Sequence, residues 1–216
     1  MLSFPLRAPG AEPLRFLLLG AHCDDIEIGC GGTVLRLARE HPDASFTWVA
    51  FASTPERKRE AEASAARFLA GASARHVEVA AFRESYFPFV GAELKDYFET
   101  LKSHRPDVVF THYRGDRHQD HRTISDLTWN TFRNQLVLEY EIPKWDGDLG
   151  IPNCFVPLAR ETALRKAALI VEGFPSQASR AWFTADTFTS LSRLRGIECN
   201  AAEGHAEAFH LRKAVL

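Results

Sequence analysis

The sequence predicts an α/β protein with a parallel central sheet. Short apolar runs bounded by turn residues alternate with longer segments of helical spacing, which is typical of repeated β-α units. The run 14–19 (LRFLLL) is almost wholly apolar and indicates a strand buried on both faces. Polar residues and glycines follow this run directly. Because ligands of open α/β sheets bind at the carboxyl ends of the strands, we expect a functional site there.

The expected strands are short runs of apolar, aromatic and β-branched residues. The run 46–52 (FTWVAFA) shows this composition most clearly. The other strands are expected at 76–79, 108–110, 136–140 and 154–156, with a closing extended segment at 206–216. Residues 141–153 (EIPKWDGDLGIPN) are rich in Pro, Gly and Asp, and structureless loops of this length are usually functional.

The expected helices carry apolar residues three and four positions apart. The first starts at Thr33 and has its charged residues on one side. Pro55, which a first helical turn tolerates, begins the second, and this helix runs to Gly71. The remaining helices are expected at 92–104, 121–132, 158–171 and 183–194.

Composition limits the class of protein. The chain has 216 residues, of which 45% are hydrophobic and 25% are charged, and this fits one globular domain spanning 1–216. Its formal net charge is −2 with both signs interspersed, which argues against a nucleic-acid or membrane-binding surface. The expected partners are therefore small molecules.

Targeting and redox features favour a cytoplasmic protein. No run reaches the roughly 18 apolar residues that a membrane span needs, and residues 1–13 lack the apolar core of a signal peptide. The four cysteines form no CxxC pair, so we expect reduced thiols rather than disulfides or a structural zinc ribbon.

Two strand ends carry the candidate chemistry. His22, Asp24 and Asp25 follow the first strand, and His118 and His121 lie in the polar loop after the fourth. A catalytic zinc site takes three nitrogen or oxygen ligands and leaves one position open. His22, Asp25 and His121 supply such a set, and Fe²⁺ is an alternative to Zn²⁺ because two histidines and a carboxylate suit both ions.

The remaining polar residues fit the hydrolysis of an amide. Asp24 stands beside the expected ligands and can act as general base toward a metal-activated water molecule. His118 lies three residues from His121, so one can bind the metal while the other meets the substrate. Asp120 is placed to orient His118 and keep it protonated, which would stabilise the oxyanion of a tetrahedral intermediate.

Simpler interpretations stay open. Two histidines at this spacing are often surface residues, and an Asp-Asp pair after a strand is often a turn and a helix cap, although their joint occurrence at two strand ends favours a site. The glycine cluster 29–32 (GCGG) could instead form the dinucleotide-binding turn of a Rossmann-type protein or dehydrogenase without a metal site. That interpretation is weaker, because two carboxylates would lie next to the pyrophosphate.

Both motifs resemble those of a known family. AHCDDIEIGCGG (21–32) is similar to the AHPDDxExGxGG signature, and HQDH (118–121) to the HPDH signature, of the LmbE-like, PIG-L-type zinc-dependent N-acetylglucosaminyl deacetylases. The resemblance extends from about Leu14 to the C-terminus. It implies a Rossmann-like three-layer sandwich with a mostly parallel sheet, and removal of the acetyl group from an N-acetylated amino sugar or sugar conjugate.

The resemblance also implies a role for each polar residue of the two motifs. It implies that the metal ligands are His22, Asp25 and His121. Asp24 is implied as the general base, and His118 as the electrostatic catalyst that the carboxylate of Asp120 holds in place.

Three further positions are implied as substrate contacts, although each side chain could instead be a solvated surface residue. Arg59 matches the arginine of a helical R-x-x-E pattern, and Arg57 with Glu60 gives an alternative register. Glu84 lies in FRESYFP, which resembles the family's acidic sugar-binding loop. His205 stands where a YAEAF-like stretch of the family has tyrosine.

Departures from the signatures leave the substrate open. Cys23 and Gln119 replace the prolines of the two signatures. Cys23 is a soft ligand, but a buried thiol is favoured because His22 and Asp25 already supply two ligands. Neither the particular N-acetyl sugar nor assembly into a homo-oligomer is determined by these residues.

Overall fold

The chain folds around one β-sheet. The computed structural model describes residues 5–6 and 12–215, and over these residues the sheet has seven strands in the order β3-β2-β1-β4-β5-β7-β6. The strands are β1 (Arg15–Gly20), β2 (Ser45–Ala52), β3 (Ala74–Phe82), β4 (Val108–His112), β5 (Leu136–Tyr140), β6 (Cys154–Leu158) and β7 (His205–Leu211). β1 to β5 run parallel, and β7 runs antiparallel to both β5 and β6. The prediction of a mostly parallel sheet is confirmed.

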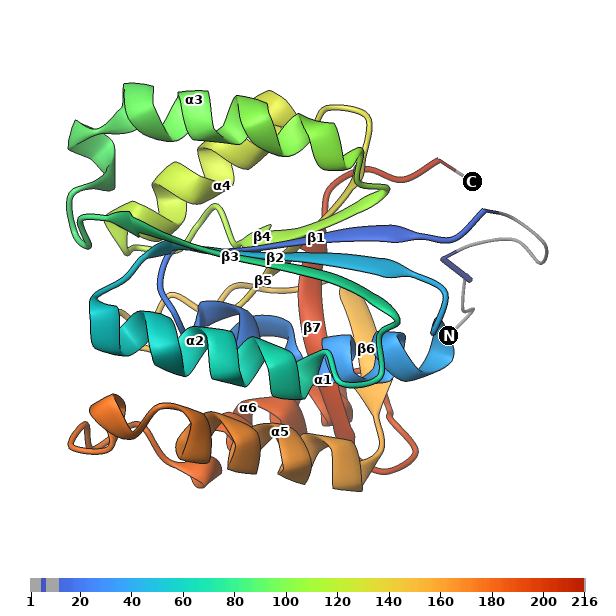
Figure 1. Cartoon of the computed structure of the whole chain (residues 1–216). Coiled ribbons are helices and arrows are strands. Elements are labelled where there is room, and N and C mark those ends of the chain that lie inside the picture. The colour runs from blue at the N-terminus through green and yellow to red at the C-terminus, as the bar shows by residue number, and fades with distance from the viewer. Residues whose placement is uncertain (1–4, 7–11, 216) are drawn as a thin grey trace.

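Helices cover both faces of this sheet. They are α1 (Asp25–Glu40), α2 (Pro55–Phe68), α3 (Gly91–Leu101), α4 (Gln119–Thr131), α5 (Arg160–Gly173) and α6 (Ala185–Glu198), with short 3₁₀ turns η1 (Phe87–Phe89), η2 (Lys102–His104) and η3 (Pro175–Gln177). α3 and α4 lie on one face, and α1 and α2 lie on the other (Figure 1). α5 and α6 lie beyond α1 and α2 on the same side. The fold is the three-layer α/β sandwich that the resemblance implied.

Two apolar layers separate the sheet from its helices. Along β1, Phe16 and Leu18 belong to one layer, whereas Leu17 and Leu19 belong to the other. All four side chains are buried, because successive strand residues point to opposite faces and both faces of β1 are covered. This double burial explains why the run 16–19 contains no polar residue, whereas Arg15 at the start of the strand is exposed.

α1 begins earlier than the sequence predicted. We expected a helix from Thr33 with the glycines 29–32 in a preceding turn, but the helix starts at Asp25 and contains all of them. A Cβ atom added to Gly29 would lie 2.1 Å from the ring of Tyr140. The glycines therefore serve close packing of α1 against its neighbours. They do not form the dinucleotide-binding turn of the alternative interpretation.

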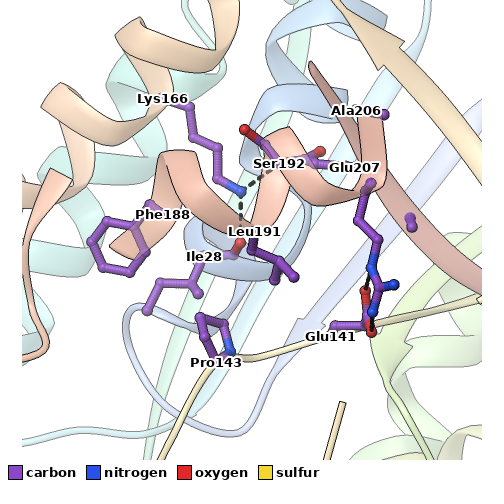
Figure 2. Close-up of a pocket in the computed structure, with 12 residues that line it drawn as sticks. Ile28, Glu141, Pro143, Lys166, Phe188, Leu191, Ser192, Ala206 and Glu207 are labelled. Atoms are coloured by element: carbon purple, nitrogen blue, oxygen red, sulfur yellow. Dashed lines mark hydrogen bonds and ion pairs between the residues drawn. The ribbon is translucent and has the colours of Figure 1, made fainter. Parts of the chain in front are cut away.

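A buried carboxylate ties the C-terminal strands to α1. Glu207 of β7 accepts hydrogen bonds from the backbone N–H groups of Gly32 at 2.8 Å and Thr33 at 2.6 Å. It also forms an ion pair of 2.6 Å with Lys166 of α5, whose ammonium donates to the carbonyl of Ile28. Figure 2 shows Lys166 pointing toward Ile28 and Glu207. The adjoining cavity measures about 20 Å³, which is room for a single water molecule. These contacts therefore hold the fold together.

The remaining boundaries differ little from the predicted ones. β3 is longer than 76–79, because it pairs with β2 along most of its length. The expected helix 92–104 divides into α3 and η2 and stops at Arg105, whose φ is 46°. Within the described part of the chain, each helix is too short or too polar to cross a membrane.

Candidate metal centre

The candidate site lies where two neighbouring parallel strands end. β1 pairs with β4; β2 and β3 extend the sheet beyond β1, and β5 extends it beyond β4. The chain thus proceeds outward in both directions from the boundary between β1 and β4. Such a switch point is where open α/β sheets bind ligands. The loops that carry both sequence motifs leave the sheet at this boundary.

The three predicted ligands come together there. His22 Nδ1 lies 3.2 Å from His121 Nε2 and 3.3 Å from Asp25 Oδ2. His121 Nε2 lies 3.6 Å from Asp25 Oδ1. Atoms bound to a tetrahedral zinc ion at 2.0–2.1 Å lie roughly 3.3 Å apart. A different oxygen of Asp25 lies near each histidine, and the chemistry of these donors suits a divalent cation.

Each candidate ligand is held by a further contact. His22 Nε2 lies 3.2 Å from Asp120 Oδ2, and His121 Nδ1 lies 2.8 Å from Asp116 Oδ2. Asp25 Oδ2 accepts a hydrogen bond of 2.6 Å from the backbone N–H of His22. Carboxylates behind metal-binding histidines fix the ring orientation and the tautomer. Here the two carboxylates hold the far nitrogens, so that His22 Nδ1 and His121 Nε2 are the ring nitrogens that face each other.

The charges in this cluster favour a cation. Burial lowers the pKa of His22, but the carboxylates of Asp25 and Asp120 outweigh burial and raise this pKa to about 10. Burial raises the pKa of Asp25, but the surrounding histidines outweigh it and hold this pKa well below its usual range. Burial lowers the pKa of His121 to about 3, so its imidazole is neutral. The carboxylates of Asp25 and Asp120 thus attract a cation to the cluster, where the neutral imidazole of His121 can bind it.

A further histidine, not predicted from the sequence, adjoins the ligands. His112, the last residue of β4, is fully buried and stacks on His121 with ring centroids 3.9 Å apart. With Asp25 and His121 it forms an alternative set of three donors within 4.8 Å of one another. However, His112 Nε2 accepts a hydrogen bond of 2.9 Å from the backbone N–H of Ala21. Because this atom is already engaged, we favour His22 as the third ligand.

Asp116 is a second site residue that was not predicted from the sequence. Its Oδ1 accepts a hydrogen bond of 2.7 Å from the backbone N–H of His118, and its Oδ2 lies 2.8 Å from both His121 Nδ1 and Lys144 Nζ. Burial raises the pKa of Asp116, but His121 and Lys144 outweigh burial and hold it well below the usual range. Asp116 is therefore an anion. The polar loop after the fourth strand was the only sequence signal that could have indicated it.

Asp24 lies beside the ligands and is paired with an arginine. Its Oδ1 accepts a hydrogen bond of 2.8 Å from Arg57 Nη2, and the two side chains are 10% and 15% exposed. Burial raises the pKa of Asp24, and this effect outweighs the charge of Arg57, which acts to lower it. A carboxylate with increased proton affinity next to a candidate metal centre can serve as a general base.

Arg57, rather than the predicted Arg59, faces the site. Arg57 Nη1 lies 3.4 Å from Ser176 Oγ, and its guanidinium lies 5.3 Å from the ring centroid of Phe174. Glu60 accepts a hydrogen bond of 2.6 Å from Ser176, so the alternative register Arg57 and Glu60 is the one near the site. Arg59 is exposed. Helical residues two positions apart point in nearly opposite directions, which is why both arginines cannot face Asp24.

His118 and Asp120 are arranged differently from the prediction. We expected the Asp120 carboxylate to orient His118, but it contacts His22 and accepts backbone hydrogen bonds from Ser85 at 2.6 Å and Phe87 at 3.2 Å. His118 Nδ1 accepts a hydrogen bond of 3.2 Å from the backbone N–H of Asp120, so the ring proton sits on Nε2. Burial and the charge of His22 lower the pKa of His118. His118 is therefore a neutral hydrogen-bond donor, not the protonated imidazole we expected.

The loop that carries Glu84 is fastened to the start of α4. Gln119 Nε2 donates a hydrogen bond of 2.6 Å to the carbonyl of Ser85, next to the bonds that Asp120 accepts. Gln119, where the resembling signature has proline, thus helps to hold this loop. Glu84 is exposed, and its charge contributes to the raised pKa of His22. This position is compatible with the predicted substrate contact.

The side chain of His205 forms a hydrogen bond outside the candidate metal centre. It begins β7, and its Nδ1 lies 3.0 Å from Ser192 Oγ of α6. Among the described residues, no hydrogen bond joins it to the histidine–aspartate cluster. The structure therefore does not bring His205 together with the other predicted site residues.

Cys23 points away from the candidate ligands. Its Sγ donates to the carbonyl of Ala52 at 3.2 Å, and the residue is buried. Burial raises the pKa of this thiol to about 12. Cys23 therefore fits the buried thiol that the sequence favoured.

The fold and the site define the class as a Rossmann-like α/β protein with a candidate catalytic metal centre at its switch point. Residues 17–132 match the model of the PIG-L family, described as GlcNAc-PI de-N-acetylase. The chain belongs to this family. The matched segment runs from β1 to the residue after α4 and includes both motifs. The family resemblance is therefore confirmed.

Solved structures show that the fold is shared with proteins of different named activity. The conserved protein TT1542 from Thermus thermophilus is 22% identical, with a TM-score of 0.74 over 94% of this chain and 96% of that chain. The N,N'-diacetylchitobiose deacetylase from Pyrococcus horikoshii is 19% identical, with a TM-score of 0.72 over 97% and 87%. GalB, the 4-carboxy-2-hydroxymuconate hydratase from Pseudomonas putida, is 15% identical, with a TM-score of 0.71 over 94% and 98%. Fold alone therefore does not select one reaction.

Proposed function

We propose that this protein is a metal-dependent N-deacetylase that releases acetate from an N-acetylated amino sugar or sugar conjugate. The family description and the deacetylase from Pyrococcus horikoshii support this reaction class. The observation that carries the proposal is the presence of Asp24 and His118 beside the three candidate ligands. A carboxylate base and a neutral imidazole donor can supply the proton transfer and the oxyanion stabilisation that enzymatic amide hydrolysis uses.

His22, Asp25 and His121 would hold the cation, which we propose to be Zn²⁺ or Fe²⁺. When bound, such a cation supplies Lewis acidity, which lowers the pKa of a water molecule and polarises a carbonyl group. The set of two imidazole nitrogens and one carboxylate suits both ions. Asp116 and Asp120 would keep the two imidazoles oriented toward it.

Asp24 would move the proton. Its carboxylate takes a proton from the attacking water and returns it to the amide nitrogen. The C–N bond then breaks, and the products are acetate and the free amino sugar. Arg57, 2.8 Å from Asp24 Oδ1, holds the carboxylate in one orientation during this transfer.

His118 would stabilise the negative charge that develops on the carbonyl oxygen. Its Nδ1 is occupied by the backbone N–H of Asp120, so Nε2–H is the donor that remains. The rings of His118 and His22 meet edge to face with centroids 4.8 Å apart, which places His118 at the candidate ligands. A neutral donor aimed at a developing oxyanion typically contributes ~10²–10³ in rate.

Arg57 and Glu84 are the proposed substrate contacts. The guanidinium of Arg57 is held by Asp24, Ser176 and Phe174, so its remaining N–H groups have a fixed direction toward an incoming hydroxyl. Glu84 is exposed beside His22 and can accept hydrogen bonds from sugar hydroxyls. In this proposal Arg57 takes the place that the sequence assigned to Arg59.

The direct test is a screen of N-acetyl sugars and their conjugates for release of acetate and free amine. The protein is loaded with Zn²⁺ or Fe²⁺, and Asp24→Asn with the same metal content serves as the control. We expect acetate from at least one substrate with the native protein and a large loss with the variant. Fully loaded protein that releases no acetate from any member, or that instead hydrates an unsaturated carboxylate, would overturn the proposed function.

A further inference from the structure

We propose a second divalent-cation site, formed by His76, Glu78 and His104. His76 Nε2 lies 2.6 Å from Glu78 Oε1, and His104 Nε2 lies 3.6 Å from the same oxygen. One ligand atom from each residue lies within 4.8 Å of the other two. Two imidazole nitrogens and one carboxylate oxygen are donors that Zn²⁺ and neighbouring transition ions bind. This inference does not depend on the proposed deacetylase activity.

Regular secondary structure brings these side chains together. His76 and Glu78 are two residues apart on β3, so they point to the same face of the sheet. β3 pairs with β2, where Thr47 lies opposite His76. His104 ends η2, directly after α3, and its Nδ1 lies 3.4 Å from Thr47 Oγ1. The three donors therefore come from the edge strand and from the turn that packs beside it.

The far atoms of two donors are already engaged. The hydroxyl of Tyr97 donates a hydrogen bond to Glu78 Oε2, which leaves Oε1 facing the histidines. Thr47 occupies His104 Nδ1, which leaves Nε2 facing Glu78. Partners of this kind orient the ligands of bound metals. Glu78 and His104 are thus each held by a second side chain.

Charge and exposure also suit a cation. Burial raises the pKa of Glu78, but the hydrogen bonds from Tyr97 and His76 outweigh burial and lower it, so the carboxylate is anionic. The side chains of His76, Glu78 and His104 are 55%, 29% and 27% exposed. An ion can therefore enter from solvent and keep water as a further ligand. An exposed acidic group alone would not support a site, but an oriented carboxylate between two imidazoles does.

The two sites are separate. Thr47 and His76 lie near the starts of β2 and β3, whereas the candidate catalytic cluster follows the ends of β1 and β4. β3 is the outermost strand and pairs only with β2 among the described strands. A cation bound by His76, Glu78 and His104 would link this edge strand to η2. Binding to the folded protein alone would then stabilise it.

The test measures zinc binding by calorimetric titration and by metal content after dialysis. The protein is first stripped with a chelator. The variants are His76→Gln, His104→Gln and the double variant Asp25→Ala/His121→Ala, which removes two candidate catalytic ligands. His41→Gln is the matched control, because it makes the same chemical change outside both clusters. His76 is largely exposed, so His76→Gln should fold even if His104→Gln does not.

We expect about two Zn²⁺ per chain in the native protein and in His41→Gln, and about one in each of the other variants. In the Asp25→Ala/His121→Ala protein, zinc at about 100 times its dissociation constant should raise Tm by about 5–10 °C. Adding His76→Gln to that protein should abolish the rise. The second site would be overturned if the Asp25→Ala/His121→Ala protein bound no zinc. It would also be overturned if that protein still bound zinc after His76→Gln was added. A deacetylase assay plays no part in this outcome, so failure of the proposed function would be seen separately.

Discussion

Arg57 Nη2 lies 2.8 Å from Asp24 Oδ1, and this ion pair joins the first turn of α2 to the residue at the N-cap position of α1. Arg57 is itself held by Ser176 and by the ring of Phe174. Contacts within the protein therefore orient the Asp24 carboxylate. Because Asp24 and the candidate ligands are positioned by different partners, their roles can be separated by mutation.

Asp24→Asn should keep the metal and lose activity. The amide cannot take a proton from water, whereas His22, Asp25 and His121 are unchanged, and loss of a general base typically costs ~10²–10⁴ in rate. Steady-state kinetics and metal content are measured on the same preparation. If metal content falls in parallel with activity, Asp24 is a ligand and the proposed division of roles fails.

Arg57→Lys should lower kcat/KM by about 10- to 100-fold, because an ammonium cannot reproduce a charged hydrogen bond worth roughly 1.5–3 kcal/mol in this geometry. Arg59→Lys is the matched control. Arg59 is exposed, so its replacement should leave kcat/KM within experimental error. A larger loss in Arg59→Lys than in Arg57→Lys would restore the register that the sequence first favoured.

Asp116→Asn should weaken metal binding by about 10- to 100-fold, since it removes the anionic partner of His121 Nδ1. Competition with a chelator of known affinity measures the change. Asp126→Asn, an exposed substitution on α4, the helix that carries His121, provides the comparison and should not alter affinity. Equal affinities in all three proteins would show that Asp116 does not support the site.

Gly29→Ala should destabilise the protein by about 1–3 kcal/mol through overpacking, because the new Cβ would lie 2.1 Å from the ring of Tyr140. Gly91→Ala is the control. No atom lies within 4 Å of a Cβ at Gly91, and alanine is the better helix former, so stability should be unchanged or slightly higher. Urea denaturation monitored by circular dichroism compares the two. A fully stable Gly29→Ala protein would mean that α1 can move away from β5 at little cost.

His205→Tyr should leave kcat/KM within roughly tenfold, about 1.4 kcal/mol. Burial and the charges of Arg193 and Arg160 lower the pKa of His205, so the imidazole is neutral at pH 7 and gains its proton only at lower pH. Because its described hydrogen bond is to Ser192, the pH profiles of the two proteins should superimpose. Loss of one titration from the profile of the variant would place His205 at the substrate.

The sequence by itself determined the layers of this protein and the place of its candidate site. β1 was predictable because a strand covered on both faces must be apolar at every position, and Phe16 to Leu19 are. The meeting of His22, Asp25 and His121 was predictable for a related reason. Parallel strands end at a common edge, so residues that follow β1 and β4 come together even though 91 positions separate Ala21 from His112.

Only the tertiary structure decided which partner each polar group has. Asp120 reaches His22 rather than His118, Arg57 rather than Arg59 meets Asp24, and His112 and Asp116 surround His121. These contacts depend on where α2 and the loop before α4 sit over the sheet. Similarly, only the structure shows that the glycines of α1 lie within the helix, where Gly29 packs against Tyr140 and Gly31 against Phe68. Apolar spacing and strand ends are local or periodic features of the chain, so the sequence shows them directly. A hydrogen-bond partner is fixed by distances of a few ångströms between separate elements. Packing alone sets those distances.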